Sequence, residues 1–126
     1  MTIKFLATEK AASAVGPYSQ GIEANNMIFT SGQLPVDMET GEISIGNIER
    51  ETRLCLEGVR AVLAAGGATL ENIVKVTVFV TDIGDFSAIN EVYAEFFTDH
   101  KPARSLVEVS KLPKGVNIEI EAIAVK

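Results

Sequence analysis

The stretches PARSLVEV (residues 102–109) and VNIEIEAIAV (residues 116–125) alternate apolar and polar side chains, as strands with one buried face do. Leu112-Pro113-Lys114-Gly115 lies between them and is typical of a turn. We therefore expect a β-hairpin, in which side-chain parity assigns every residue to one of two faces. The apolar face, which suits the core, would hold Ser105, Val107, Val109, Val116, Ile118, Ile120 and Ala122.

The other face of this predicted hairpin mixes charged and apolar side chains. It would hold Arg104, Leu106, Glu108, Asn117, Glu119, Glu121, Ile123 and Val125, so that the arginine faces a set of glutamates. Such a face is too apolar for ordinary solvated surface and too charged for a core. We expect a partner subunit to cover it, with a cleft for a small molecule between the two.

The rest of the chain predicts three more strands and two helices. The strands are Ile3–Leu6, Met27–Ser31 and Ile73–Thr81. The first helix is expected to begin at Asn47, a good N-cap, and to end at Gly66-Gly67. The second is expected to begin at Asp85 and to end before Pro102. The order strand, strand, helix, strand, helix, strand, strand predicts an α+β fold, a mixed sheet with two helices on one face.

Local patterns refine this prediction. Asn25-Asn26 indicates a tight turn, and Gly58 indicates close packing of the first helix against the sheet. Alternation assigns one face of the third strand to Val74, Val76, Val78 and Val80. The apolar stripe of the second helix consists of Phe86, Ile89, Tyr93, Phe96 and Phe97.

Composition limits the class of protein. With 126 residues, 47% of them hydrophobic, the chain predicts a single globular domain over residues 1–126. The net charge of −6, with no two adjacent Lys or Arg residues, argues against a nucleic-acid partner. Neither a signal peptide nor an apolar run long enough to cross a membrane is recognisable. We therefore expect a cytoplasmic protein that does not enter the membrane.

Cysteine and histidine are each present once. Cys55 lies on the apolar stripe of the first helix and is expected to be an inert core residue, in keeping with a reducing compartment. His100 is expected at the surface. So few ligands argue against a metal site, and nothing in the sequence indicates a cofactor.

Four blocks of sequence resemble the Rid family, the reactive intermediate deaminases, also called the endoribonuclease L-PSP family. They are GPYSQ (16–20), SGQLP (31–35), NEVY (90–93), and PARS (102–105) with IEIE (118–121). The resemblance covers essentially the whole chain. It implies a chorismate-mutase-like α+β fold and a homotrimer with clefts at the subunit interfaces. It also implies hydrolysis of 2-iminobutanoate and 2-iminopropanoate to 2-keto acids and ammonia, without a cofactor, which protects pyridoxal-phosphate enzymes from reactive intermediates.

Arg104 and Glu119 are the candidate catalytic residues. A guanidinium can bind the carboxylate of an imino acid through two parallel hydrogen bonds, which suits Arg104. On spacing alone an ordinary ion pair with Glu108 explains Arg104 equally well, and the resemblance favours ligand binding. Glu119 would place and deprotonate the attacking water. Without the resemblance, Glu119 is better explained as a solvated strand carboxylate. Glu121 lies on the same face, and only the family pattern selects Glu119 of the two.

The remaining candidates would bind substrate. Tyr18 could donate a phenolic hydrogen bond or simply pack on its turn, and Ser31 and Gly32 could admit a ligand at a strand end or simply punctuate a turn. Asn90, next to the helix stripe, would face a neighbour, as a ligand contact or as an ordinary polar interface residue. Leu106 stands where many relatives have Cys, so that only its backbone contribution carries over.

Two other functions stay open at this point. The family name implies an RNA-cleaving translation inhibitor, which the acidic charge opposes. A ligand-sensing or chaperone-like trimer without enzymatic activity is the second, and the joint presence of Arg104 and Glu119 favours the enzyme.

Overall fold

The alternating residues near the end of the chain form the strand at the middle of the sheet. In the computed structural model, which describes residues 2–126, β6 (Ile118–Val125) lies between β3 (Met27–Thr30) and β4 (Ile73–Val80). Its burial alternates residue by residue, with Ile118, Ile120, Ala122 and Ala124 buried. The predicted core face of this strand is therefore confirmed.

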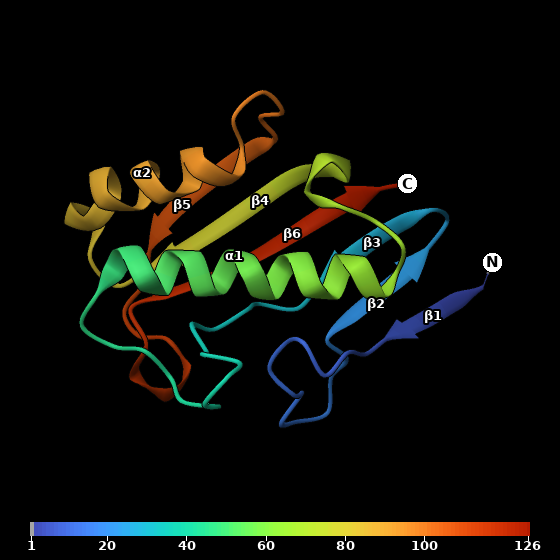
Figure 1. Ribbon diagram of the computed structural model, residues 1–126, viewed down its shortest axis with the longest axis horizontal. Helices are drawn as coiled ribbons and strands as arrows, with labels where there is room; N and C mark the ends of the chain where they lie inside the picture. Colours follow the sequence, from blue (N-terminus) through green and yellow to red (C-terminus); the bar gives the residue numbers. More distant parts are fainter. Residues whose placement is uncertain (1) are drawn as a thin grey trace.

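The complete sheet has six strands in the order β1-β2-β3-β6-β4-β5 (Figure 1). The other strands are β1 (Ile3–Leu6), β2 (Gly21–Ala24) and β5 (Ala103–Glu108). Only β4 and β5 run parallel, and all other neighbours are antiparallel. The predicted α+β class with a mixed sheet is confirmed.

The predicted hairpin of β5 and β6 is wrong, because β4 lies between the two strands. The helix α2 (Phe86–Phe96) makes the crossover that returns the chain parallel to β4, which is the usual way to join parallel strands. Residues 109–117 then carry the chain past β4 to the far side of that strand. The turn at Pro113–Gly115 exists as a short 3₁₀ helix, but it does not join neighbouring strands.

Sequence reasoning missed β2. The turn that it did predict, Asn25-Asn26, joins β2 to β3, and both residues have positive φ (51° and 61°) as a two-residue hairpin turn requires. The strand itself, Gly-Ile-Glu-Ala, contains three residues that are depleted in strands. Glu23 is nevertheless buried, because its carboxylate pairs with Lys126 Nζ at 3.0 Å.

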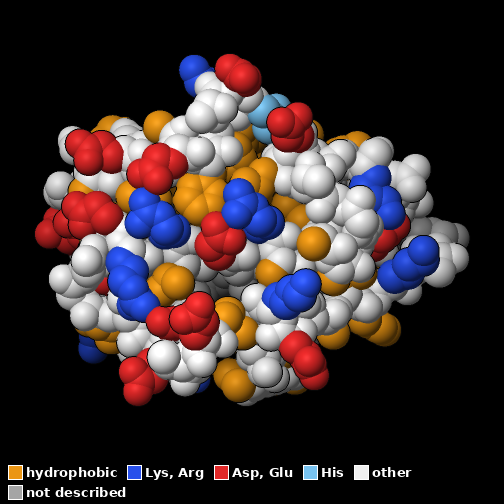
Figure 2. Space-filling view, in the orientation of Figure 1, with side chains coloured by type: hydrophobic (Ala, Val, Ile, Leu, Met, Phe, Trp, Pro, Cys, Tyr) orange, Lys and Arg blue, Asp and Glu red, His pale blue; other side chains and the backbone are white. Residues whose placement is uncertain are grey.

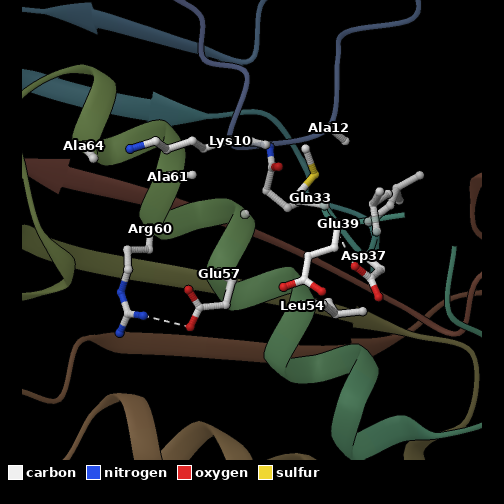
Figure 3. Close-up of a pocket in the computed structure, with 15 residues that line it drawn as sticks. Lys10, Ala12, Gln33, Asp37, Glu39, Leu54, Glu57, Arg60, Ala61 and Ala64 are labelled. Carbon is white, nitrogen blue, oxygen red and sulfur yellow. Dashed lines mark hydrogen bonds and ion pairs between the residues drawn. The ribbon is translucent and has the colours of Figure 1, made fainter. Parts of the chain in front are cut away.

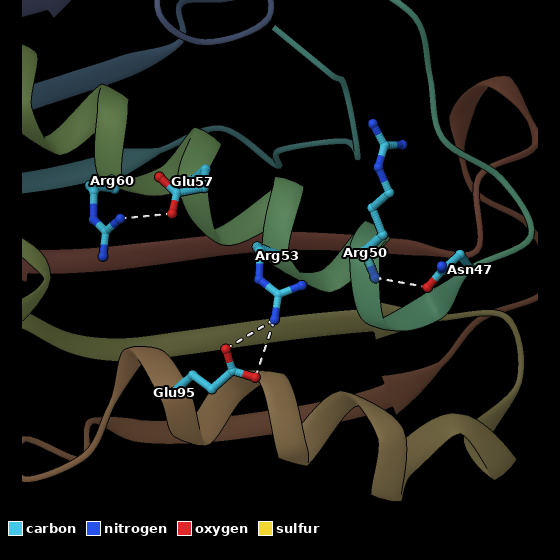
Figure 4. A network of polar contacts seen from close by, with 6 residues as sticks. All are labelled: Asn47, Arg50, Arg53, Glu57, Arg60 and Glu95. Atoms are coloured by element: carbon cyan, nitrogen blue, oxygen red, sulfur yellow. Dashed lines mark hydrogen bonds and ion pairs between the residues drawn. The ribbon is translucent and has the colours of Figure 1, made fainter.

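Both helices cover the same face of the sheet (Figure 1). The helix α1 (Ile48–Ala65) begins as predicted at Asn47, whose Oδ1 accepts the Arg50 N–H at 3.0 Å, and it ends at Gly66-Gly67. An exposed ion pair between Arg53 and Glu95, at 3.0 Å, joins α1 to α2 (Figure 4). Such exposed pairs contribute little stability, so the apolar core must hold the two helices in place.

The start of α2 differs from its prediction. Asp85 occupies the N-cap position without a capping hydrogen bond from its side chain, and Phe86 is 44% exposed rather than buried. Ile89 and Phe97 are buried as predicted, Tyr93 and Phe96 pack against the core, and Val92 joins the buried stripe without having been predicted there. The short 3₁₀ helices elsewhere are Leu70–Asn72 and Ile83–Asp85. No helix within residues 2–126 is long and apolar enough to cross a membrane.

A β-bulge corrects the predicted face of β4. The register against β6 shifts between Ile73 and Lys75, so the intervening Val74 points outward and is 46% exposed. Val76, Val78 and Val80 are buried as predicted, and Ile73 takes the inward position.

The face of the sheet opposite the helices, here called the open face, carries many apolar side chains. Strand pairing assigns it Ile22, Met27, Phe29, Phe79, Val107, Ile123 and Val125, among which lie Glu119 and Glu121. Ser105 and Val107 were expected in the core, yet both are exposed. Leu106 was expected on the open face, yet it packs against the core beneath the helices.

We predict that Gly58→Ala destabilises the protein by about 1 kcal/mol. Alanine favours a helix interior over glycine by about 1 kcal/mol, but a Cβ at residue 58 would lie 2.8 Å from Gln33 Oε1 and 3.2 Å from Gln33 Cβ. Overpacking of this kind typically costs about 1–3 kcal/mol. Chemical denaturation measures the free energy of unfolding.

Ala64→Gly is the matched control, because Ala64 is exposed on the same helix and reports the helix preference alone. A Gly58→Ala protein more stable than the wild type would show that the Gln33 contact does not require glycine.

Candidate functional site

Arg104 lies on the helix-covered side of the edge strand β5. It pairs with the buried Val76 of β4, and its side chain reaches α2, where Nη1 donates to Asn90 Oδ1 at 2.7 Å. Its Cζ lies 4.7 Å from the centre of the Tyr93 ring and 5.7 Å from that of Phe86. A neutral amide and two aromatic rings therefore surround the guanidinium.

No carboxylate pairs with Arg104. Within residues 2–126, the ion pairs shorter than 4.0 Å involve Arg50, Arg53, Arg60 and Lys126. The alternative of an ion pair with Glu108 is wrong, because that carboxylate accepts the Ile83 N–H at 2.9 Å. Since a guanidinium has five N–H donors and Asn90 takes one, Arg104 retains donors for a planar anion.

Glu119 lies on the open face, directly over Gly32. A Cβ at residue 32 would overlap the Glu119 carboxylate, so glycine leaves this side chain room for its present conformation. Burial raises the pKa of Glu119 above its usual value, and the neighbouring Glu121 raises it further. A carboxyl group of this kind exchanges a proton more readily near neutral pH than an ordinary glutamate does.

Tyr18 and Gly32 line the same cavity, of about 300 Å³. Tyr18 is 51% exposed, and its hydroxyl accepts the Val15 N–H at a long 3.4 Å. Ser31 Oγ already donates to the Ser19 carbonyl at 2.5 Å. Lys114, which sequence reasoning treated only as part of a turn, lines this cavity as well. Lys114 has a positive φ of 59°, a conformation that the composition of the turn does not predict.

The structure therefore forms two separate groups of predicted residues. Arg104, Asn90 and Leu106 lie on the helix-covered side, whereas Glu119, Gly32 and Glu121 lie together on the other side. Phe79 of β4 pairs with Val107 of β5 on one side and with Glu119 of β6 on the other. Glu119 is therefore level with Val107, two strands across the sheet, and Arg104 lies three residues before Val107 along β5. Standard strand dimensions put the two Cα atoms about 14 Å apart.

The prediction that Arg104 faces the glutamates within one chain is accordingly wrong. It depended on pairing β5 directly with β6, which would have given residues 104 and 119 the same parity. The parallel register with β4 instead turns Arg104 toward the helices.

A cavity of about 580 Å³ is lined by neither candidate catalytic residue (Figure 3). It lies between α1 and the segments around residues 10–12 and 33–39. Its Arg60 and Glu57 already pair with each other at 2.7 Å. The candidate catalytic residues therefore lie outside this cavity.

The remaining titratable candidates are accounted for as follows. Cys55 is fully buried as predicted, and burial raises the pKa of its thiol well above its usual value. His100 is half-buried rather than superficial, with Nε2 2.6 Å from the Ile73 carbonyl oxygen. Among residues 2–126, no three His, Cys, Asp or Glu side chains are grouped so as to hold a metal ion.

Comparison with known proteins identifies the family. The model of the family described as endoribonuclease L-PSP matches residues 8–126. The chain belongs to the endoribonuclease L-PSP, or Rid, family. A 2-iminobutanoate/2-iminopropanoate deaminase of Escherichia coli is 51% identical over 126 residues, which cover 98% of each chain.

Solved structures of Rid-family relatives agree with this fold. A crystal structure of E. coli TdcF with bound serine has a TM-score of 0.92 and 49% identity, covering 98% of each chain. A putative endoribonuclease from Thermotoga maritima has a TM-score of 0.94 and 54% identity, covering 98% of this chain and 97% of its own.

The raised pKa of Glu119 predicts a pH-dependent effect of Glu119→Gln on stability. Folding disfavours the ionised carboxylate, so Glu119 lowers the free energy of unfolding only where it is ionised in the unfolded chain. This destabilisation is absent below the usual glutamate pKa and is complete above the raised pKa of the folded protein. We expect Glu119→Gln to unfold at a higher temperature than the wild type at pH 7, with the difference shrinking toward pH 4. Thermal unfolding across this range measures it.

Glu42→Gln, at an exposed position of the loop between β3 and α1, is the control for removal of a carboxylate. A Glu119→Gln protein that gains most at pH 4 would reverse the sign and contradict the prediction.

Proposed function

We propose that this protein hydrolyses short 2-imino acids to 2-keto acids and ammonia, without a cofactor. The observation that carries the proposal is Arg104, whose guanidinium contacts an amide and an aromatic ring and has no carboxylate partner among residues 2–126. A guanidinium in this state can bind a small planar anion, such as a carboxylate, through two parallel hydrogen bonds. The names of the relatives, a deaminase of imino acids and a protein with bound serine, support ligands that carry a carboxylate beside a nitrogen.

The reaction needs one water and a group that moves protons. In this proposal Arg104 binds the substrate carboxylate, and Glu119 takes a proton from the water as its oxygen adds to the C=N carbon. Starting from the protonated imine, Glu119 then returns this proton to the nitrogen of the adduct. As the C–N bond breaks and ammonia leaves, Glu119 accepts the proton of the added hydroxyl group, whose oxygen becomes the keto oxygen of the product. The raised pKa of Glu119 supports both steps, because the group must accept and then donate a proton.

The two residues act on one substrate only if two copies of the chain combine. Arg104 and Glu119 lie on opposite faces of the sheet, about 14 Å apart between their Cα atoms by strand geometry. We infer a homotrimer of the chorismate-mutase-like type, in which Arg104 of one subunit meets Glu119 of the next. Exposed apolar residues on the open face, including Phe5, Phe29 and Val125, support burial against another subunit.

The other candidates have supporting roles in this site. Asn90 orients Arg104 through their hydrogen bond, and Gly32 leaves space for the Glu119 carboxylate. Tyr18 and the Ser31 backbone line the approach from the side of Gly32, and Leu106 contributes its backbone alone. We propose 2-iminobutanoate and 2-iminopropanoate as substrates, and protection of cytoplasmic pyridoxal-phosphate enzymes as the purpose.

Removal of the guanidinium tests the proposed activity. We expect the wild-type protein to accelerate 2-ketobutanoate release when a threonine dehydratase generates the imine, with semicarbazide used to trap the imine that remains. Arg104→Lys keeps the charge but loses the fork, and we expect kcat/KM to fall roughly 10- to 100-fold, with a larger loss for Arg104→Ala.

Arg53→Lys is the matched control, because that arginine makes an exposed ion pair away from the site. No acceleration by the wild type, or undiminished acceleration by Arg104→Ala, would reject the proposal.

RNA cleavage that co-purifies with the protein and survives Arg104→Ala would favour the ribonuclease alternative. On the face drawn in Figure 2, basic and acidic side chains are interspersed, which gives RNA little to bind.

Mixing two inactive variants tests the shared site. If each site takes Arg104 from one subunit and Glu119 from its neighbour, then random co-assembly of Arg104→Ala and Glu119→Gln chains leaves both residues intact in about one quarter of the sites. We expect co-refolded chains to regain about one quarter of wild-type activity. Activity that stays at the level of the separate variants would mean that the site lies within one chain.

A further inference from the structure

Tyr93 contacts the guanidinium that the site depends on, although neither the sequence patterns nor the comparisons give it a role. It lies three residues after Asn90 on α2, so both side chains project from the same side of the helix. Asn90 accepts a hydrogen bond from Nη1 at the edge of the guanidinium. The Tyr93 ring lies against the face of the guanidinium, with the ring centre 4.7 Å from Cζ. An edge contact and a face contact together fix the plane of the guanidinium.

The tyrosine ring is itself held by packing. It contacts Phe97, with ring centres 4.7 Å apart and planes inclined by 37°, and it packs against the core. Phe97 is buried, so this neighbour is fixed. The ring therefore provides a rigid support for Arg104 rather than a mobile cover.

The hydroxyl of Tyr93 does not explain this placement. It is buried and makes no hydrogen bond to any residue within 2–126, whereas buried tyrosine hydroxyls are normally paired. A buried hydroxyl without a partner opposes folding. The contacts of the ring with Arg104 and Phe97 must therefore stabilise it in this position.

We propose that Tyr93 is a positioning residue, whose ring face fixes Arg104 so that its free N–H edge is presented to a carboxylate. The inference rests on the proposed function only in that Arg104 binds the substrate carboxylate. A cation above an aromatic face is stabilised by the ring and restricted in orientation, which reduces the order that a ligand has to impose.

Paired substitutions separate the ring from the hydroxyl. Tyr93→Phe keeps the ring, and we expect KM for the imine to remain within about 2-fold of wild type. Tyr93→Leu removes the ring, and we expect KM to rise about 10-fold with kcat nearly unchanged, the pattern of lost ground-state binding. Phe96→Leu is the control, since it removes a comparable arginine–aromatic contact, Arg60 over Phe96 at 5.1 Å, away from the site.

Two further measurements keep the inference testable. Calorimetric titration with 2-ketobutanoate should show the same order of affinities, wild type and Tyr93→Phe above Tyr93→Leu. If Tyr93→Leu does not fold, NMR of the wild type decides, because a ring below the guanidinium shifts the Arg104 δ and ε protons upfield, and the assignment follows from Arg104→Lys. Unshifted protons would overturn the inference.

The outcomes distinguish this inference from the proposed function. A wild type that binds 2-ketobutanoate more tightly than Tyr93→Leu does, but does not hydrolyse the imine, would support the role of Tyr93 and reject the deaminase. An active wild type with KM unchanged in Tyr93→Leu would overturn the role of Tyr93 and retain the deaminase. Equal damage from Tyr93→Phe and Tyr93→Leu would overturn it too, since the hydroxyl would then be the active part.

Discussion

Two helices bury one face of the sheet and leave the other uncovered, and this asymmetry decides the environment of every functional side chain (Figure 1). In β6, the residues that face the helices are fully apolar, and the residues between them carry the carboxylates of Glu119 and Glu121. Because side chains alternate strictly along a strand, neither set can change face without a bulge or a slip of register. The fold thus fixes which groups share a compartment before any ligand is considered.

The two compartments have opposite electrostatic character. On the helix side, Arg104 is surrounded by neutral partners, so its charge is available to an anion. On the open side, Glu119 is partly buried beside a second carboxylate, and both conditions raise its pKa. The helix side thus holds a cation and the open side a weakened acid, the two groups that the proposed reaction requires.

The sequence predicted the local elements well and their long-range pairing poorly. Asn47 and Gly66-Gly67 bound the first helix because capping chemistry is local. The partner of β5 was not predictable in the same way, since the turn residues at 112–115 suit a hairpin and equally suit a longer connection. The resemblance to a family singled out Arg104 and Glu119 as candidates, but parity without the strand order gave the wrong face for Arg104. Tyr93 was predicted only as a core residue, because a cation above a ring has no signature in sequence.

The contact between Gly32 and Glu119 ties together two positions that are far apart in the chain. The backbone at residue 32 touches the carboxylate so closely that a single methyl group there would displace it. A residue with a Cβ at position 32 would force the Glu119 side chain out of its present conformation. Substitutions at the two positions are therefore coupled, because the side chains that position 32 can accept depend on the conformation of the side chain at position 119.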